Sequence, residues 1–287
     1  MSNVGIVTDT TASIPEPMAQ DLAIELVPYY MIRGQETLRD LFDIRPDEFA
    51  AYLAQTDKLP TTSCPSPGDY IAAFKRLAER TREIVALTMT SKGSGAYTSC
   101  CAAVDLLREQ RPEVNVQVVD TLQVAMSLGW SVIQAARAAL QGLTQNEVLA
   151  KAHAAAQNGM MLQTADTLRY LYLGGRIMRA QHLIGTLLNI KPIIGMEDGV
   201  IVALGTARSR SRAYARMAEL AGERLGEGAR IKVAFTHCAA REQLELLKAQ
   251  IVQRFDCVEI VITPLSPVLA VHSGPGTVGM SFIPADD

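Results

Sequence analysis

Short apolar runs of strand length alternate along this chain with longer segments of helical periodicity. The first run, Val4–Asp9, ends in polar residues and predicts a buried strand. The apolar run at 24–32 contains Pro28, which has no backbone N–H to donate and therefore predicts an edge or bent strand. Similar runs predict further strands at 84–89, 114–119, 160–164, 231–235 and 258–262.

Helix signals fill the segments between these runs. Ser66 followed by Pro67 predicts a helix start, and this helix should end near residue 80. Thr144 and Glu147 have the spacing of a capping box, and Asp166 is expected to cap a helix after the strand at 160–164. Two more segments predict helices: 123–140, which is apolar on nearly all faces, and 244–255.

A hairpin signal marks the C-terminal half. Apolar runs at 190–196 and 200–204 flank Glu197-Asp198-Gly199, and an Asp-Gly pair suits a primed turn. Because strands alternate with helices throughout, the chain is expected to be an α/β protein. The change from strand–helix alternation to a hairpin predicts an N-terminal α/β domain at 1–160 and a C-terminal α/β domain at 161–287.

Composition excludes several classes of protein. The chain has 287 residues, with 27 Lys+Arg against 30 Asp+Glu, so its net charge of −3 and its 5% of aromatic residues do not indicate a nucleic-acid partner. The five cysteines have neither CxxC nor zinc-site spacing, which predicts no metal centre and a reducing cytoplasmic location. No apolar run has the length of an uninterrupted membrane span, and the N-terminus lacks the pattern of a signal peptide.

The segment 60–68 concentrates hydroxyl groups between prolines. Thr61, Thr62 and Ser63 can each donate and accept hydrogen bonds. Since the prolines restrict the backbone, this segment is interpreted as a loop suited to hold a small oxyanion. Ordinary turn chemistry is the alternative for these three residues.

A glycine-rich segment, 90–97, follows the strand at 84–89 and opens a helix. Unpaired N–H groups and the helix dipole favour an anion at such a point. Gly93 and Gly95 would let a ligand approach the backbone around Ser94 closely. The spacing is neither that of a Walker loop nor that of a nucleophile elbow, and a loop with a helix cap is the alternative.

Two more candidates stand beside glycines. His272 precedes Gly274-Pro275-Gly276, which is expected to hold it on a rigid turn. Gly174 and Gly175 predict a helix C-cap from which Arg176 projects as a fork for phosphate or carboxylate. The alternatives are a structural histidine and a surface arginine.

Six segments together resemble the DegV family and span residues 4 to 283. They are VTDTTASIP, LPTTSCPSPGDY, TSKGSGAYTSC, TLRYLYLGGRI, LIGTLLNIKPII and HSGPGTVG. The resemblance implies a two-domain α/β fold, with a mostly parallel sheet in the N-terminal domain and one long-chain fatty acid in the interdomain cleft. It implies a carrier, without cofactor or catalytic activity of its own, that presents palmitate, stearate or oleate to a separate fatty acid kinase.

The resemblance also implies roles for single residues. Thr62, Ser94 and His272 would bind the fatty-acid carboxylate, supported by the loop residues Thr61, Ser63, Gly93 and Gly95. Arg176 would contact the kinase or the acyl-phosphate. Two residues depart from the family pattern: Cys64 stands where Gln is common, and Ala96 where Thr is usual. Both departures adjoin the head-group residues.

Two other functions stay open at this point. Ser94 as nucleophile and His272 as base would make a serine hydrolase or acyltransferase, provided that folding brings an acid such as Asp9 or Asp120 to the histidine. Alternatively, the chain is a regulatory module in which the lipid is a structural ligand.

Overall fold

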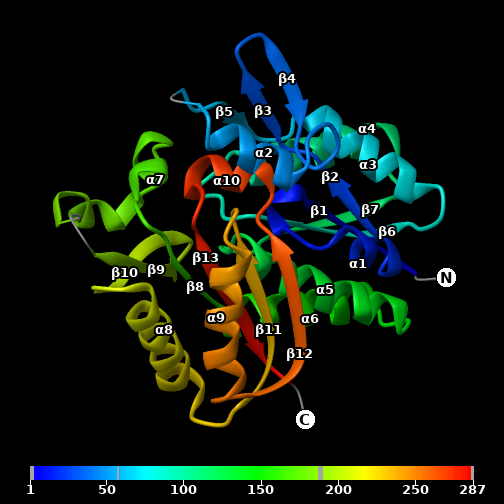
Figure 1. The fold of residues 1–287 in the computed structure, drawn as a ribbon. Helices are drawn as coiled ribbons and strands as arrows, with labels where there is room; N and C mark the ends of the chain where they lie inside the picture. The colour runs from blue at the N-terminus through cyan, green and yellow to red at the C-terminus, as the bar shows by residue number, and fades with distance from the viewer. Residues whose placement is uncertain (1–2, 57, 187–189, 286–287) are drawn as a thin grey trace.

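The computed structural model describes residues 3–56, 58–186 and 190–285. Residues 187–189, inside the predicted motif at 183–194, lie outside the described part of the chain. The order of elements alternates strands and helices for most of the chain, which confirms the predicted α/β class (Figure 1).

A four-stranded parallel sheet forms the N-terminal part. Its strands lie in the order β2-β1-β6-β7, and every neighbouring pair is parallel. The prediction of a mostly parallel N-terminal sheet is therefore confirmed. The bounds are Val4–Asp9 for β1, Ile24–Val27 for β2, Glu83–Thr88 for β6 and Asn115–Asp120 for β7.

A six-stranded sheet forms the C-terminal part, in the order β10-β9-β8-β13-β11-β12. Only β11 and β12 run parallel to each other. The predicted hairpin is confirmed, because Asp198 and Gly199 both have positive φ in the two-residue turn between β9 and β10. The bounds are Met160–Thr164 for β8, Lys191–Glu197 for β9, Val200–Ala207 for β10, Arg230–His237 for β11, Asp256–Pro264 for β12 and Val278–Pro284 for β13.

A small antiparallel sheet, β4-β3-β5, corrects two predictions. The apolar run at 24–32 is two strands in different sheets, β2 and β3 (Tyr30–Arg33), separated at Pro28 and Tyr29, although β2 does lie at the edge of its sheet, as predicted. The proline has no N–H for a ladder, so the chain leaves the parallel sheet there. The segment expected to be an oxyanion loop is instead β5 (Thr61–Ser63), which pairs with β3, whose other neighbour is β4 (Glu36–Arg39).

Helices cover both faces of the parallel sheet. On β1, Val7 packs with residues of α3 and α4, whereas Ile6 packs on the opposite face with residues of α5 and α6. Ser66 caps α3 with a complete capping box, and Thr144 caps α6 in the same way, as predicted. The bounds are Pro67–Ala78 for α3, Ala96–Gln110 for α4, Met126–Leu140 for α5 and Gln145–Asn158 for α6.

Helices α5 and α6 also contact the six-stranded sheet (Figure 1). The indole N–H of Trp130 in α5 donates to the carbonyl of Ser281 in β13 at 3.0 Å. On β11, Ala234 faces this helical layer, and Phe235 faces the helices α8 (Arg210–Leu225) and α9 (Arg241–Val252) on the other side. Because one helical layer serves both sheets, the division at residue 160 stays a prediction.

The remaining elements are short, and one of them, α10, packs against both α2 and α7. His272 lies in the last turn of α10, so the prediction that it sits on the following turn was wrong. Asp166 caps no helix, because its carboxylate binds Lys191 and Arg210 instead. The bounds are Thr10–Ala12 for η1, Glu16–Asp21 for α1, Pro46–Leu53 for α2, Arg169–Leu173 for α7, Met178–Thr186 for η2 and Pro267–Ser273 for α10.

Candidate functional site

A cavity opens at the carboxyl ends of β1 and β6, which is where ligands bind in parallel α/β sheets. Its empty space, the open mouth included, is about 860 Å³. Segments from both halves of the chain line it: the residues after β1 and β6, then β5, the start of α4, α10, and the strands β8 to β10. The cavity therefore lies between the two sheets.

Thr62 and His272 meet at the wall of this cavity. Thr62 Oγ1 lies 3.0 Å from His272 Nε2, although the residues are 210 positions apart in sequence. In β5 successive side chains alternate in direction, so Thr62 lines the cavity, while Thr61 and Ser63 are exposed and are not among its lining residues. The structure thus brings together Thr62 and His272, two of the predicted head-group residues. It places Thr61 and Ser63, which were predicted to support them, outside the cavity.

Burial, followed by the nearby Arg176 guanidinium, lowers the pKa of His272 from 6.5 to about 4. The imidazole is therefore neutral at pH 7. Its other nitrogen, Nδ1, is buried and has no hydrogen-bond partner among the described residues. A partnerless acceptor is better tolerated in a protein interior than a partnerless N–H, so we assign the proton to Nε2, which then donates to Thr62 Oγ1.

Ser94, which also lines the cavity, is held by Tyr29, a residue that the sequence did not single out. Tyr29 OH lies 2.7 Å from Ser94 Oγ, and the Ala96 N–H donates to the same oxygen at 3.3 Å. Tyr29 is 4% exposed, and burial raises the pKa of its hydroxyl well above 10. Tyr29 follows Pro28, where the chain leaves β2 and before β3 begins. The proline within the apolar run was therefore the one sequence signal that could have drawn attention to Tyr29.

The glycine-rich segment opens α4 as predicted, with Gly95 at the N-cap and no side-chain cap. Gly93 lines the cavity, whereas Gly95 lies beside Cys64, whose Sγ would stand 3.3 Å from an added Cβ. Cys64 is a cavity-lining thiol. Ala96 is fully buried in the hydrophobic core, so its departure from the family pattern leaves the lining unchanged.

Arg176 stands at the mouth of the cavity. Gly174 caps α7 and Gly175 has φ of +69°, as the predicted C-cap requires. The exposed Arg176 side chain donates to the Gly174 carbonyl at 2.7 Å and also lines the cavity. A positive charge therefore stands in the wall of the cavity that Thr62, Ser94 and His272 also line.

Most of the remaining lining is aliphatic and rich in methionine, and the polar exceptions are Thr11, Thr90, Gln163 and Ser273. Methionine side chains are unbranched and polarisable, so they adapt to ligands of irregular shape. The apolar lining residues are Met89, Val124, Ala125, Met161, Leu171, Met178, Ile194, Met196, Ile201, Leu265, Val268 and Leu269.

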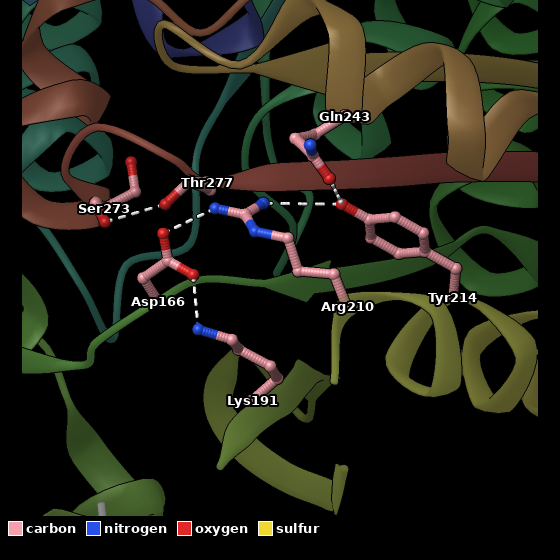
Figure 2. A network of polar contacts seen from close by, with 7 residues as sticks. All are labelled: Asp166, Lys191, Arg210, Tyr214, Gln243, Ser273 and Thr277. Atoms are coloured by element: carbon pink, nitrogen blue, oxygen red, sulfur yellow. Dashed lines mark hydrogen bonds and ion pairs between the residues drawn. The ribbon is translucent and has the colours of Figure 1, made fainter. Parts of the chain in front are cut away.

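A polar network holds the turn after His272 (Figure 2). Asp166 accepts from Lys191 at 2.6 Å and from Arg210 at 2.5 Å. The Asp166–Arg210 pair lies against Gly276, where an added Cβ would come within 3.0 Å of both side chains. Thr277 closes the turn by donating to the Ser273 carbonyl at 2.8 Å.

The geometry of a serine hydrolase is not formed. Ser94 bonds to Tyr29 and His272 to Thr62, so nucleophile and base have different partners. Neither proposed acid serves the histidine, because Asp9 accepts from Thr11 and from the Met89 N–H, and Asp120 accepts from the Ser91 and Leu122 N–H groups.

Within the described residues, no cluster of His, Cys, Asp or Glu has the arrangement of a metal site. None of the described helices is both long enough and apolar enough to cross a membrane.

Comparisons with known proteins agree with this geometry. A family model described as "Uncharacterised protein, DegV family" matches residues 3–285. A DegV domain-containing protein of Streptomyces coelicolor is 34% identical over 280 residues, which cover 97% of each chain.

Solved structures share the fold. A structure concerning fatty acid binding of a DegV family protein from Thermus thermophilus has a TM-score of 0.92 and 27% identity, covering 99% of this chain and 100% of that chain. A stearic acid-binding protein from Eubacterium ventriosum has a TM-score of 0.87 and 26% identity, with 99% and 98% covered. Together with the family model, which spans almost all of the sequence, these likenesses show that the chain belongs to the DegV family.

Proposed function

We propose that this protein binds one long-chain fatty acid in the cavity and presents its carboxylate to a separate fatty acid kinase. The observation that carries the proposal is the pairing of two hydroxyl groups, at Thr62 and Ser94, with a largely aliphatic cavity. The structural relatives named as fatty-acid-binding proteins support the same ligand.

Hydrogen-bond accounting indicates what the two hydroxyls do. His272 Nε2–H donates to Thr62, and Ala96 N–H donates to Ser94, so each oxygen is already an acceptor. Either hydroxyl can donate in the Tyr29–Ser94 pair; we assign Tyr29 as the donor, which leaves both the Thr62 and the Ser94 protons available for an anion in the cavity. The N-terminus of α4 adds a favourable dipole, and Arg176 adds a positive charge at the mouth.

The tail supplies most of the favourable free energy. About fifteen buried methylene groups at about 0.8 kcal/mol each give a gross gain of about 12 kcal/mol. The loss of translational freedom and the ordering of the tail reduce the net affinity. A dry aliphatic wall is therefore necessary, while the polar groups fix which end of the ligand reaches the mouth.

Native mass spectrometry of the purified protein, followed by denaturing extraction, tests the ligand. We expect a mass excess of one palmitate, stearate or oleate per chain. The double variant Thr62→Ala/Ser94→Ala should bind at least tenfold more weakly, because two charge-assisted hydrogen bonds are lost. Thr61→Ala/Ser63→Ala is the matched control, since these hydroxyls point away from the cavity. Lipid-free protein that binds none of the three acids would overturn the proposal.

The carrier role needs a separate test. Incubation of the loaded protein with a fatty acid kinase and ATP should yield acyl-phosphate. Arg176→Ala should lower this yield more than it lowers fatty-acid binding, because the guanidinium stands at the mouth where the phosphate forms. All five cysteines are free thiols, which supports a cytoplasmic site where ATP is available. Stable lipid that is never phosphorylated would favour a regulatory module instead.

A further inference from the structure

One polar side chain in the cavity has no part in the head-group site. Gln163 lies in β8, is 8% exposed and lines the cavity. Alternation along the strand points Met161 and Gln163 into the cavity, whereas Leu162 packs in the core on the other face. Over the described residues, the Gln163 amide has no hydrogen-bond partner. The amide faces the cavity, so a ligand that fills this space must either bond to the amide or leave it unpaired, and unpaired buried polar groups are rare.

The groups around Gln163 are mostly apolar. In the sheet it lies between Ile194 of β9 and Gly279 of β13, and Met161 precedes it on the same face. Thr236 of β11 fills the space beside Gly279, where its hydroxyl would lie 3.0 Å from an added Cβ, but within the described residues it makes no hydrogen bond to the amide. An acyl chain packed against this wall would leave the amide unpaired unless a group on the chain bonds to it.

Water can hydrate the amide while the cavity is open. Ser273 and Thr11 donate to the Leu269 carbonyl and to Asp9, but their hydroxyl oxygens can still accept from a water molecule. An acyl chain that fills the cavity displaces such water. A plain methylene chain would then leave the amide unpaired, so an oxygen fixed on the ligand itself is the better match.

We propose that Gln163 is a subsite for an acyl chain that carries a hydroxyl group partway along its length. A hydroxyl both donates and accepts, as does the primary amide, so the two can satisfy each other in the dry cavity. This inference rests on the proposed function, since it specifies which fatty acids the same cavity prefers.

The test compares stearate with a series of stearates that each carry one hydroxyl, placed at successive positions along the chain. Binding is measured by isothermal titration with the full-length protein, stripped of lipid. We expect one hydroxyl position to bind about fivefold to tenfold more tightly than stearate, which corresponds to one net hydrogen bond. A series in which no hydroxystearate binds more tightly than stearate overturns the subsite.

Two variants identify the residue responsible. Gln163→Met has a similar shape and no hydrogen-bonding amide, so the preference for the hydroxylated acid should disappear while stearate binds at least as tightly. Met161→Leu, on the same face of β8, should shift all the acids alike and keep the preference. Retention of the preference in Gln163→Met overturns the inference, as does a tenfold loss of stearate affinity there, which would assign the amide to the carboxylate.

The stearate measurement separates the two levels of failure. If the wild-type protein binds stearate but shows no preference for any hydroxylated chain, only the Gln163 subsite fails. If it binds neither stearate nor any hydroxystearate, the proposed function fails and the subsite fails with it. Thermal unfolding of each variant, with its midpoint close to that of wild type, identifies changes in binding that do not come from misfolding.

Discussion

The imidazole of His272 lies directly against Gly174, and a Cβ at position 174 would clash with its Nδ1 atom. The contact has a counterpart four residues earlier in one segment and two residues later in the other, because the Tyr170 ring occupies the space that a Cβ at Gly274 would need. The end of α7 and the end of α10 therefore interlock through two glycines. This packing fixes the direction in which His272 reaches Thr62.

Gly174→Ala should move the imidazole and break its contact with Thr62. We expect fatty-acid affinity to fall about tenfold, as for the loss of a hydrogen bond that serves a charged group. Isothermal titration with oleate measures the change. Gly68→Ala is the control, because a Cβ there meets only the Ser66 hydroxyl, at an ordinary 3.5 Å.

A double variant tests whether the glycine acts through the histidine. If it does, Gly174→Ala should add little to the loss already caused by His272→Ala, since coupled residues are not additive. Independent losses that simply add would show that Gly174 affects the cavity in another way.

Much of the fold could be predicted from local pattern. The strand Val4–Asp9, the capping boxes at Ser66 and Thr144, and the hairpin turn at Asp198 each depend on neighbouring residues, and all are present. The secondary structure of Thr62 could not be predicted, because β5 exists only through pairing with β3, a segment thirty residues earlier in the chain.

At the site, too, features set by neighbouring residues could be predicted, whereas contacts between residues distant in sequence could not. Chain pattern indicated Ser94 at the start of a helix, but nothing near Ser94 in sequence pointed to Tyr29 as its partner. Asp166 followed a strand and resembled a cap, yet its partners Lys191 and Arg210 come from later elements. Residues whose role depends on tertiary contacts were identified only where the family resemblance supplied them.

Tyr29→Phe should weaken fatty-acid binding less than Ser94→Ala does. The variant keeps the buried ring and removes only the hydroxyl that orients Ser94. We expect a threefold to tenfold loss of affinity, about 1 kcal/mol. Tyr30→Phe is the matched control: its hydroxyl donates to Asp69 at 2.6 Å and does not line the cavity. Equal effects of the two variants would contradict an orienting role for Tyr29.

Asp166→Asn should lower stability by about 1 kcal/mol at neutral pH, because a half-exposed ion pair is partly screened by solvent. Burial raises the pKa of Asp166, but hydrogen bonds from Lys191 and Arg210 outweigh it and the net pKa lies below 3.8. A lowered carboxyl pKa gives stability that is present above about pH 4 and is lost as the pH falls further.

Urea unfolding at several pH values measures this difference in stability. The gap between wild type and Asp166→Asn should close in acid and narrow in high salt. Asp105→Asn is the control, since the Asp105–Arg108 pair is 76% and 69% exposed and should contribute nothing measurable. A gap that stays constant from neutral pH to strong acid would rule out an electrostatic origin.

Asp40 makes stability depend on pH in the opposite direction to Asp166. Its carboxyl is fully buried, and Oδ1 accepts from the Val268 N–H at 3.0 Å, at the start of the helix that carries His272. Burial raises the pKa of Asp40 to about 7. Between about pH 4 and about pH 7 the folded state therefore holds a proton that the unfolded state has released, so this residue makes stability fall as the pH rises through that window.

Asp40→Asn should remove this part of the pH dependence. Asparagine keeps an oxygen acceptor for Val268 but does not titrate, so its unfolding midpoint should fall less than that of wild type between about pH 5 and about pH 8. Part of the decrease in the unfolding midpoint should remain in Asp40→Asn, because burial also raises the pKa of Asp9, to about 6. Asp43→Asn should show no such change in this range, because the hydrogen bonds from Arg39 lower the pKa of Asp43. Parallel midpoint curves for wild type and Asp40→Asn across the range would mean that Asp40 is already ionised in the folded protein below pH 5.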